Sequence, residues 1–214
     1  MKVKICGITS IEAAQTAEKA GADFIGFVFA PSSREITAEN ARKIAQTTSS
    51  TLKKVGVFVN KSAEDIETIV QKVGLDYVQL HGDEHPETAQ ALDVPVIKAF
   101  SIHQVNAEAI QSYPCTYYLI DSPGETYRGG SGKIFDWTAL EQVGIDKRKC
   151  ILAGGLNETN IQQAIHIAEP MGVDVSSGVE TDGKKDSRKI QQFITVAKQA
   201  ANEIYQIKSE VEND

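Results

Sequence analysis

Long apolar segments are missing from this sequence of 214 residues. No run approaches the roughly 18 consecutive apolar residues that a membrane-spanning helix needs. The first residues alternate lysine with valine and isoleucine, unlike the apolar core of a secretory signal peptide. We therefore expect neither a membrane-spanning segment nor a secretory leader.

Cysteine is scarce, and its three copies are far apart, at Cys6, Cys115 and Cys150. An odd and sparse set does not build a disulfide framework, and none of the spacings is typical of a zinc site. The cysteines therefore indicate a reducing compartment, and we expect the protein to be cytoplasmic and to hold no metal.

An excess of positive charge is also missing. Lysine and arginine total 22 against 29 acidic residues, which gives a formal net charge of -7. Binding to nucleic acid requires a basic face, so this composition argues against nucleic acid as a partner. A small anionic substrate needs only a local positive site and stays compatible with the charge.

The sequence does contain a regular alternation of short apolar runs and amphipathic stretches. Ser10 and Thr37 are typical helix N-caps, and Gly21 is a typical helix stop. Candidate strands lie within residues 1–9, 23–29, 53–59, 77–80, 94–99, 117–121, 150–153 and 173–175. Candidate helices cover 11–20, a stretch capped by Thr37, 62–73, a stretch begun by Pro86, 104–111, a stretch capped by Asp136, 159–168 and 187–207.

Eight such strand–helix units predict a single α/β domain with a parallel sheet. No phosphate-binding glycine cluster follows the first strand, which disfavours an open dinucleotide-binding sheet. Eight units can close a barrel without edges, so we predict a (β/α)8 TIM barrel. We expect this domain over residues 1–207, followed by a short acidic tail at 208–214.

In such a barrel, the residues that end the strands converge on one face. The strand ends supply a thiol, an arginine, an amide, an imidazole, a carboxylate and two glycine or serine turns. They are Cys6, Arg34, Asn60, Gln79, His81, Ala99, Phe100, Asp121, Gly154, Gly155, Ser176 and Ser177. This set favours an acid–base site beside an anion site.

The anion site is predicted where the seventh and eighth strands end. Gly154-Gly155 follows the seventh strand, and Ser176-Ser177 follows the eighth. TIM barrels often bind phosphate there, because glycine lets backbone N–H groups approach an anion closely. The alternative is that both are ordinary turns.

Cys6 differs from the other cysteines in its position. A lone cysteine is usually a small buried apolar residue. However, Cys115 and Cys150 open their strands and so belong to the opposite end of the barrel, whereas Cys6 ends its strand and faces the loops.

Each of the other candidates also has a structural alternative. Asp121 could cap a loop, His81 could be a satisfied loop histidine, and Arg34 could be a solvated charge. Lys184-Lys185 is interpreted as a solvated pair that can add positive potential near a phosphate.

Eight ordered motifs between Lys2 and about Ala200 resemble the phosphoribosylanthranilate isomerase family. They are Lys4-Ile5-Cys6-Gly7-Ile8-Thr9, Gly26-Phe27-Val28-Phe29, Gly56-Val57-Phe58-Val59-Asn60, Gln79-Leu80-His81-Gly82, Gly129-Gly130-Ser131-Gly132-Lys133, Phe135-Asp136-Trp137, Ala153-Gly154-Gly155-Leu156-Asn157 and Asp174-Val175-Ser176-Ser177-Gly178-Val179-Glu180.

The resemblance implies a (β/α)8 barrel of tryptophan biosynthesis. The implied reaction is the Amadori rearrangement of N-(5-phosphoribosyl)anthranilate to 1-(2-carboxyphenylamino)-1-deoxyribulose 5-phosphate, without metal or organic cofactor. It implies Cys6 as general base, Asp121 as general acid and Arg34 as the residue that binds the anthranilate carboxylate.

The remaining implied contacts involve substrate and assembly. Gln79 and His81 are implied to bind substrate, and Gly154, Gly155, Asp174, Ser176 and Ser177 to bind its phosphate. The chain is expected to be a monomer or a homodimer. The sequence shows no obvious cation beside Cys6 that would stabilise a thiolate.

Three other functions remain open at this point. A metal-dependent phosphosugar epimerase would place several His and Asp at strand ends, yet only His81 is available. An indole-forming synthase would need lysine and glutamate at the lip, and Lys98 lies inside the fifth strand. A non-catalytic phosphosugar-binding barrel is disfavoured because both Cys6 and Asp121 are present.

Overall fold

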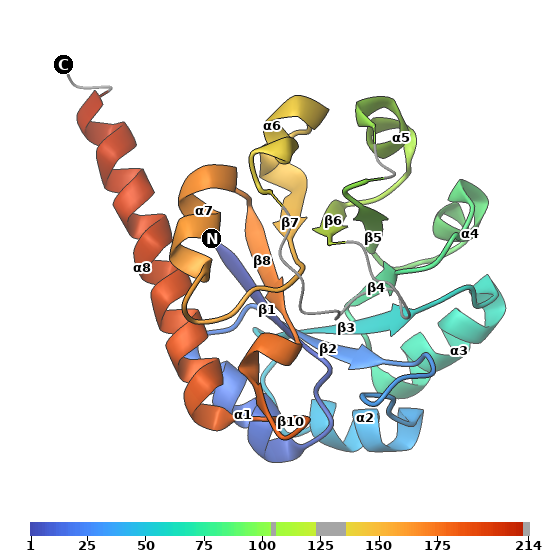
Figure 1. Ribbon diagram of the computed structural model, residues 1–214. Helices are drawn as coiled ribbons and strands as arrows, with labels where there is room; N and C mark the ends of the chain where they lie inside the picture. Colours follow the sequence, from blue (N-terminus) through green and yellow to red (C-terminus); the bar gives the residue numbers. More distant parts are fainter. Residues whose placement is uncertain (104–105, 123–135, 212–214) are drawn as a thin grey trace.

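Eight parallel strands close into a barrel in the computed structural model, which describes residues 1–103, 106–122 and 136–211 (Figure 1). Their order follows the chain, and β8 pairs with β1 to complete the ring. The strands are β1 (Lys2–Cys6), β2 (Phe24–Val28), β3 (Lys53–Phe58), β4 (Tyr77–Leu80), β5 (Val96–Ser101), β6 (Tyr117–Asp121), β7 (Cys150–Leu152) and β8 (Gly172–Val175). The predicted (β/α)8 barrel is confirmed.

Helices surround the strands (Figure 1). They are α1 (Ile11–Ala20), α2 (Ala38–Ala45), α3 (Ala63–Val73), α4 (Pro86–Gln90), α5 (Ala107–Ser112), α6 (Ala139–Val143), α7 (Ile161–Ala168) and α8 (Ser187–Val211). The predicted caps are present, because Ser10 Oγ accepts from Ala13 N and Thr37 Oγ1 from Asn40 N. Gly21 takes the left-handed conformation that ends α1.

Two apolar layers follow from the alternation of side chains along each strand. The outer layer, between strands and helices, contains Val3 and Ile5 of β1 and Val173 and Val175 of β8. The inner layer fills the lumen. It consists of Phe24, Val55, Ile97, Ala99, Leu119, Ile151 and Ala153, with Tyr77, Tyr117 and Met171 packed against it. Because Ile5 points outward, Lys4 and Cys6 point into the lumen.

The boundaries of β5 and α5 differ from the prediction. β5 starts at Val96 instead of residue 94, because Pro95 has no N–H for the strand ladder, and it runs to Ser101, opposite Asp121. Helix α5 starts at Ala107 rather than at 104, and residues 104–105 lie outside the described part.

The expected acidic tail is partly helical. Helix α8 continues to Val211, past residue 207, and Lys208 forms an ion pair with Glu169 next to α7. Its C-terminal turns project away from the barrel (Figure 1). Residues 212–214 lie outside the described part.

A small hairpin after β8 is not indicated by the sequence pattern. A 3-10 turn (Ser177–Val179) leads into β9 (Glu180–Thr181) and β10 (Lys184–Lys185), which pair antiparallel. The motif Gly129-Gly130-Ser131-Gly132-Lys133 lies outside the described residues.

Candidate active site

The strand ends form two sides of one site at the mouth of the lumen. Cys6 ends β1, Asp121 ends β6, and the loops after β7 and β8 lie between these strands around the ring. Both residues are buried, with 7% and 6% of their surface exposed.

Cys6 lies directly over Gly26 of the neighbouring strand. A Cβ on Gly26 would stand 2.9 Å from Cys6 Sγ and 3.3 Å from Lys4 Nζ, so only glycine leaves room for both groups. Lys4 is 1% exposed, and its Nζ lies 2.8 Å from Asp174 Oδ1 of β8. A buried ion pair therefore lies beside the thiol.

Burial raises the pKa of the Cys6 thiol, and the carboxylate of Asp174 raises it further. Lys4 is the largest opposing influence, followed by Lys185. The pKa of Lys4 is raised: burial alone would lower it, but Asp174 and Cys6 together outweigh that cost. The expectation of no cation beside Cys6 is wrong, because the strand places Lys4 there.

Lys4 could have been found from the sequence. It alternates with the outward Val3 and Ile5, and strands of an all-parallel barrel are covered on both faces. A lysine at such a position is buried, and a buried lysine requires a partner. The partner itself, Asp174, is far away in the chain and was not identifiable by spacing.

Arg34 lies across Gly7, which follows Cys6. A Cβ on Gly7 would stand 2.6 Å from Arg34 Cδ, and Gly7 has a φ of +75°. Arg34 donates from Nε and Nη2 to the two carboxylate oxygens of Glu180, at 2.7 and 2.8 Å. A guanidinium carries five N–H donors, so this fork leaves others for a substrate.

Lys185 shares the same carboxylate. Its Nζ lies 2.6 Å from Glu180 Oε1 and 2.9 Å from Ser176 O, and its side chain is 3% exposed. Burial raises the pKa of Glu180, but the hydrogen bonds from Arg34 and Lys185 outweigh it and the pKa is lowered. The predicted solvated pair is therefore wrong for Lys185, whereas Lys184 is exposed. The β9–β10 hairpin causes the difference because it folds Lys185 inward.

On the opposite side, Asp121 faces a chain of polar groups from β4. Its Oδ2 lies 3.5 Å from His81 Nε2, and His81 Nδ1 lies 2.8 Å from Gln79 Nε2. With the amide donating, Nδ1 is the acceptor and the imidazole directs Nε2–H toward the carboxylate. The structure thus brings Gln79, His81 and Asp121 together.

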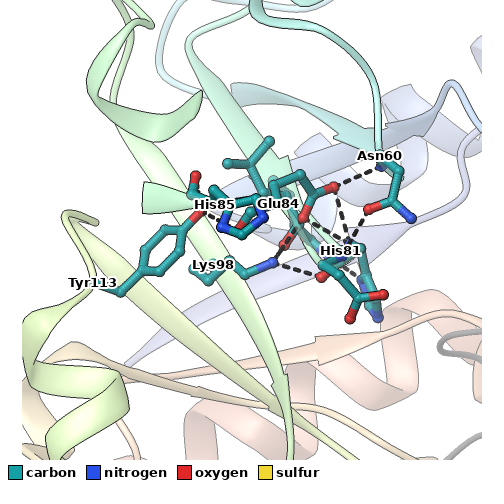
Figure 2. Close-up of polar contacts among 10 residues, drawn as sticks. Asn60, His81, Glu84, His85, Lys98 and Tyr113 are labelled. Carbon is teal, nitrogen blue, oxygen red and sulfur yellow. Dashed lines mark hydrogen bonds and ion pairs between the residues drawn. The ribbon is translucent and has the colours of Figure 1, made fainter. Parts of the chain in front are cut away.

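Glu84 and Lys98 form a buried clamp that holds the loop carrying His81 (Figure 2). Glu84 Oε1 accepts from Asn60 N at 2.8 Å, and both Glu84 oxygens accept from Gly82 N. Lys98 Nζ donates to Glu84 Oε2 and Gly82 O, each at 2.7 Å. The clamp fixes the backbone on both sides of His81.

Lys98 does not belong to the lumen. Val96 and Phe100, which share its face of β5, pack in the outer layer. Its Nζ lies 5.5 Å from the centre of the Tyr113 ring (Figure 2). The lysine that an indole-forming synthase would need is therefore turned away from the site. In the described ranges no three His, Cys, Asp or Glu side chains are grouped as metal ligands would be.

The loops predicted to bind phosphate pack tightly on their surroundings. Gly154 has a φ of +87° and Gly155 of +63°, and a Cβ on Gly154 would stand 2.5 Å from Ser122 N. A Cβ on Gly178 would meet Leu156 O at 1.9 Å, so the loops after β7 and β8 touch. Ser176 Oγ donates to Cys6 O at 3.2 Å, which joins this region to the end of β1.

Asp174 does not fit the phosphate set to which the sequence assigned it. Its carboxylate would repel a phosphate and is engaged by Lys4 inside the lumen. Ser177 opens the 3-10 turn after β8, next to the glycine loop. We therefore keep only Gly154, Gly155, Ser176 and Ser177 as candidates for phosphate binding.

Comparisons with known proteins agree with this geometry. Residues 3–196 match the family model described as N-(5'phosphoribosyl)anthranilate (PRA) isomerase. The N-(5'-phosphoribosyl)anthranilate isomerase of Oceanobacillus iheyensis is 51% identical over 196 residues, which are 91% of this chain and 96% of that protein.

Two solved structures extend the match to the fold. The phosphoribosyl anthranilate isomerase of Thermotoga maritima has 40% identity and a TM-score of 0.82, covering 93% of this chain and 99% of that one. An enzyme of the same name in complex with reduced 1-(o-carboxyphenylamino)-1-deoxyribulose 5-phosphate has 37% identity, a TM-score of 0.79 and the same coverage. In the described residues no helix is long and apolar enough to cross a membrane. The chain belongs to the N-(5'-phosphoribosyl)anthranilate isomerase family and is an isomerase.

Proposed function

We propose that this chain converts N-(5'-phosphoribosyl)anthranilate to 1-(o-carboxyphenylamino)-1-deoxyribulose 5-phosphate in tryptophan biosynthesis, with Cys6 as general base and Asp121 as general acid. The observation that carries the assignment is the placement of one thiol and one carboxylate at the lumen mouth on strands β1 and β6, which β7 and β8 separate. A sugar phosphate held by the loops after β7 and β8 would lie between them.

The chemistry follows from these positions. Asp121 donates a proton to the ring oxygen of the ribosylamine, the C1–O bond breaks, and the nitrogen lone pair forms a protonated Schiff base. The Cys6 thiolate then removes the C2 proton, which neutralises the Schiff base and gives an enolamine.

The last step restores both groups. The enol oxygen loses its proton to the Asp121 carboxylate while C1 takes the proton that Cys6 carries, and the ketone forms. No proton is gained or lost overall, as an isomerisation requires. His81, within 3.5 Å of Asp121, orients the carboxylate through these transfers.

Substrate binding divides among the remaining groups. Gly154, Gly155, Ser176 and Ser177 would bind the phosphate, and Arg34 the anthranilate carboxylate through N–H groups that Glu180 does not use. Gln79 and His81 would contact the sugar from β4. We place the enzyme in the cytoplasm, which its three free cysteines support.

Its assembly is proposed as monomer or homodimer. The Thermotoga maritima isomerase is described as dimeric. Sedimentation velocity across a range of protein concentrations separates the two states.

Substitution of the two reacting groups tests the proposal. Cys6→Ala and Asp121→Asn should each lower kcat by at least about a thousandfold, while the reduced product analogue still binds. Turnover is followed as loss of anthranilate-type fluorescence with substrate generated in situ. Cys115→Ser, at the opposite end of the barrel, should leave kcat unchanged. Near-normal turnover in Cys6→Ala or Asp121→Asn would remove that residue from the mechanism.

A further inference from the structure

Lys4 and Cys6 are alternate residues of β1 and share the lumen face. Both groups lie in the space that Gly26 leaves open on β2, as the distances to a hypothetical Cβ show: 3.3 Å for Lys4 Nζ and 2.9 Å for Cys6 Sγ. The ammonium and the thiol are therefore next to one another within the wall of the barrel.

The ammonium of Lys4 has donors to spare. A lysine carries three N–H donors. Among the described residues, its oxygen acceptor is Asp174 Oδ1, at 2.8 Å. With 1% of Lys4 exposed, bulk solvent does not reach this end of the side chain, and the sulfur of Cys6 is an adjacent group able to accept.

The charges around Cys6 leave a positive excess. Lys4 of β1, Lys185 of β10 and Arg34 of the loop after β2 face it as cations, and Asp174 of β8 and Glu180 of β9 are their carboxylate partners. Three positive and two negative charges sum to +1. A Cys6 thiolate would bring this group to neutrality.

Lys4 differs from the other two cations in how its charge is used. Arg34 and Lys185 share Glu180, and Lys185 also donates to Ser176 O at 2.9 Å. Their charge is directed toward the hairpin after β8. Lys4 is the cation that lies on the same strand and the same face as the thiol.

We propose that Lys4, held in the lumen by Asp174, stabilises the Cys6 thiolate and so sets the pH range in which Cys6 acts as a base. Lys4 is a positioning residue in this assignment, because it acts through Cys6. The inference rests on the proposed catalytic role of Cys6.

Substitutions of Lys4 and of Asp174 should shift the pKa of Cys6 in opposite directions. Removal of Lys4 takes away the largest influence that opposes burial, so the pKa of Cys6 should rise. Removal of the Asp174 charge takes away a carboxylate that raises that pKa, so it should fall. A purely structural ion pair would not produce shifts of opposite sign.

The experiment is a titration of the thiolate by its ultraviolet absorbance. The same titration of the matching Cys6→Ser variant is subtracted, which removes tyrosine and the other cysteines. Lys4→Met should shift the midpoint upward by at least about one pH unit, the effect of a nearby opposite charge, and lower kcat/KM at neutral pH about tenfold or more. Lys4→Arg should largely restore both.

Two further variants complete the design. Asp174→Asn should shift the midpoint downward. Lys2→Met removes a half-exposed lysine from the same strand and should leave the midpoint in place. If Lys4→Met does not fold, Lys4→Met/Asp174→Asn replaces the pair without an unpaired charge and should still show a raised midpoint, because Lys4 outweighs Asp174.

The outcomes separate this inference from the proposed function. An unchanged midpoint in the Lys4 variants overturns the inference, whatever Cys6→Ala does to turnover. A raised midpoint together with near-normal turnover in Cys6→Ala supports the coupling of Lys4 to the thiol and overturns Cys6 as the base.

Discussion

Two buried lysine–carboxylate pairs in this barrel have the same chemistry and different surroundings. Lys4 Nζ lies 2.8 Å from Asp174 Oδ1, and Lys98 Nζ lies 2.7 Å from Glu84 Oε2. Both lysines are nearly inaccessible, at 1% and 4% exposed. The first pair faces the lumen, and the second faces the helix layer.

The Lys4–Asp174 and Lys98–Glu84 pairs also differ in their hydrogen bonds. Lys98 donates to Leu80 O and Gly82 O as well as to Glu84, and Glu84 accepts from two backbone N–H groups (Figure 2). The ammonium of Lys98 and the carboxylate of Glu84 are thus both used to hold the loop that carries His81. Lys4 keeps donors beside a thiol. Two lysines of equal burial are thus assigned a structural and a chemical role by the group next to them.

The largest expected effect concerns the Glu84–Lys98 clamp. Lys98→Met leaves the Glu84 carboxylate buried without its cation and should cost about 3–5 kcal/mol of unfolding free energy. Glu84→Gln/Lys98→Met removes both charges and should recover part of that loss. Urea unfolding measures each variant.

The matched control for the clamp is the exposed pair Lys2–Asp23. The side chain of Lys2 is 51% exposed, so Lys2→Met should change stability by less than about 1 kcal/mol. Equal losses in Lys98→Met and Lys2→Met would contradict the assignment of the clamp as a buried, loop-holding pair.

A smaller effect is expected from Arg34, whose pair with Glu180 is only partly buried. Arg34→Ala should raise KM about tenfold, equivalent to about 1.4 kcal/mol, with a smaller change in kcat, since Arg34 is proposed to bind the anthranilate carboxylate. Steady-state kinetics on the full chain measure both constants.

Arg148 supplies the control for Arg34. It makes the same two-bond fork, to Asp146 at 2.9 and 3.1 Å, but it is 90% exposed and precedes β7 at the far end of the barrel. Arg148→Ala should leave KM unchanged. A KM change below twofold in Arg34→Ala would count against carboxylate recognition.

The smallest effect compares Cys6, beside the buried Lys4, with Cys150, a buried thiol at the opposite end of the barrel. Burial raises the pKa of Cys150 to about 12 from an ordinary value of 9.0. Between these values the unfolded chain loses the proton and the folded chain keeps it, so stability should fall as pH rises above about 9, by about 1 kcal/mol between pH 9 and pH 10.

Cys150→Ala removes this contribution. The difference in unfolding free energy between about pH 8 and pH 10 should therefore be smaller in Cys150→Ala than in the unsubstituted chain. Chemical unfolding at both pH values checks it. Identical pH dependence in the two proteins would show that burial does not hold this thiol protonated.

Much of the barrel could be predicted because its signals are local. Ser10 and Thr37 cap helices through N–H groups three residues away, and the apolar run of β2 indicates a strand covered on both faces. Boundaries were less certain where strand pairing decides them. Ser101 belongs to β5 because Asp121 lies opposite it on β6, a contact that the local sequence does not encode.

The candidate site is likewise divided between residues that local signals identify and contacts that only the fold creates. Cys6, Asp121 and the glycine and serine turns could be identified from their places at strand ends and from the family resemblance. Asp174 was assigned to the phosphate from its motif alone, whereas its partner is Lys4, from the other end of the chain. Lys185 was interpreted as solvated because nothing local indicates that a hairpin turns it toward Glu180.

The sequence by itself determined the eight strand–helix units, the caps that begin its helices, and the residue types at the lumen mouth, since each depends on neighbours a few positions apart. The tertiary structure decided which charges face one another. Closure of β8 onto β1 brings Asp174 to Lys4, and the pairing of β3, β4 and β5 brings Lys98 and Asn60 to Glu84. The physical reason is that a buried charge needs a partner in space, and closure of the barrel, not spacing along the chain, provides it.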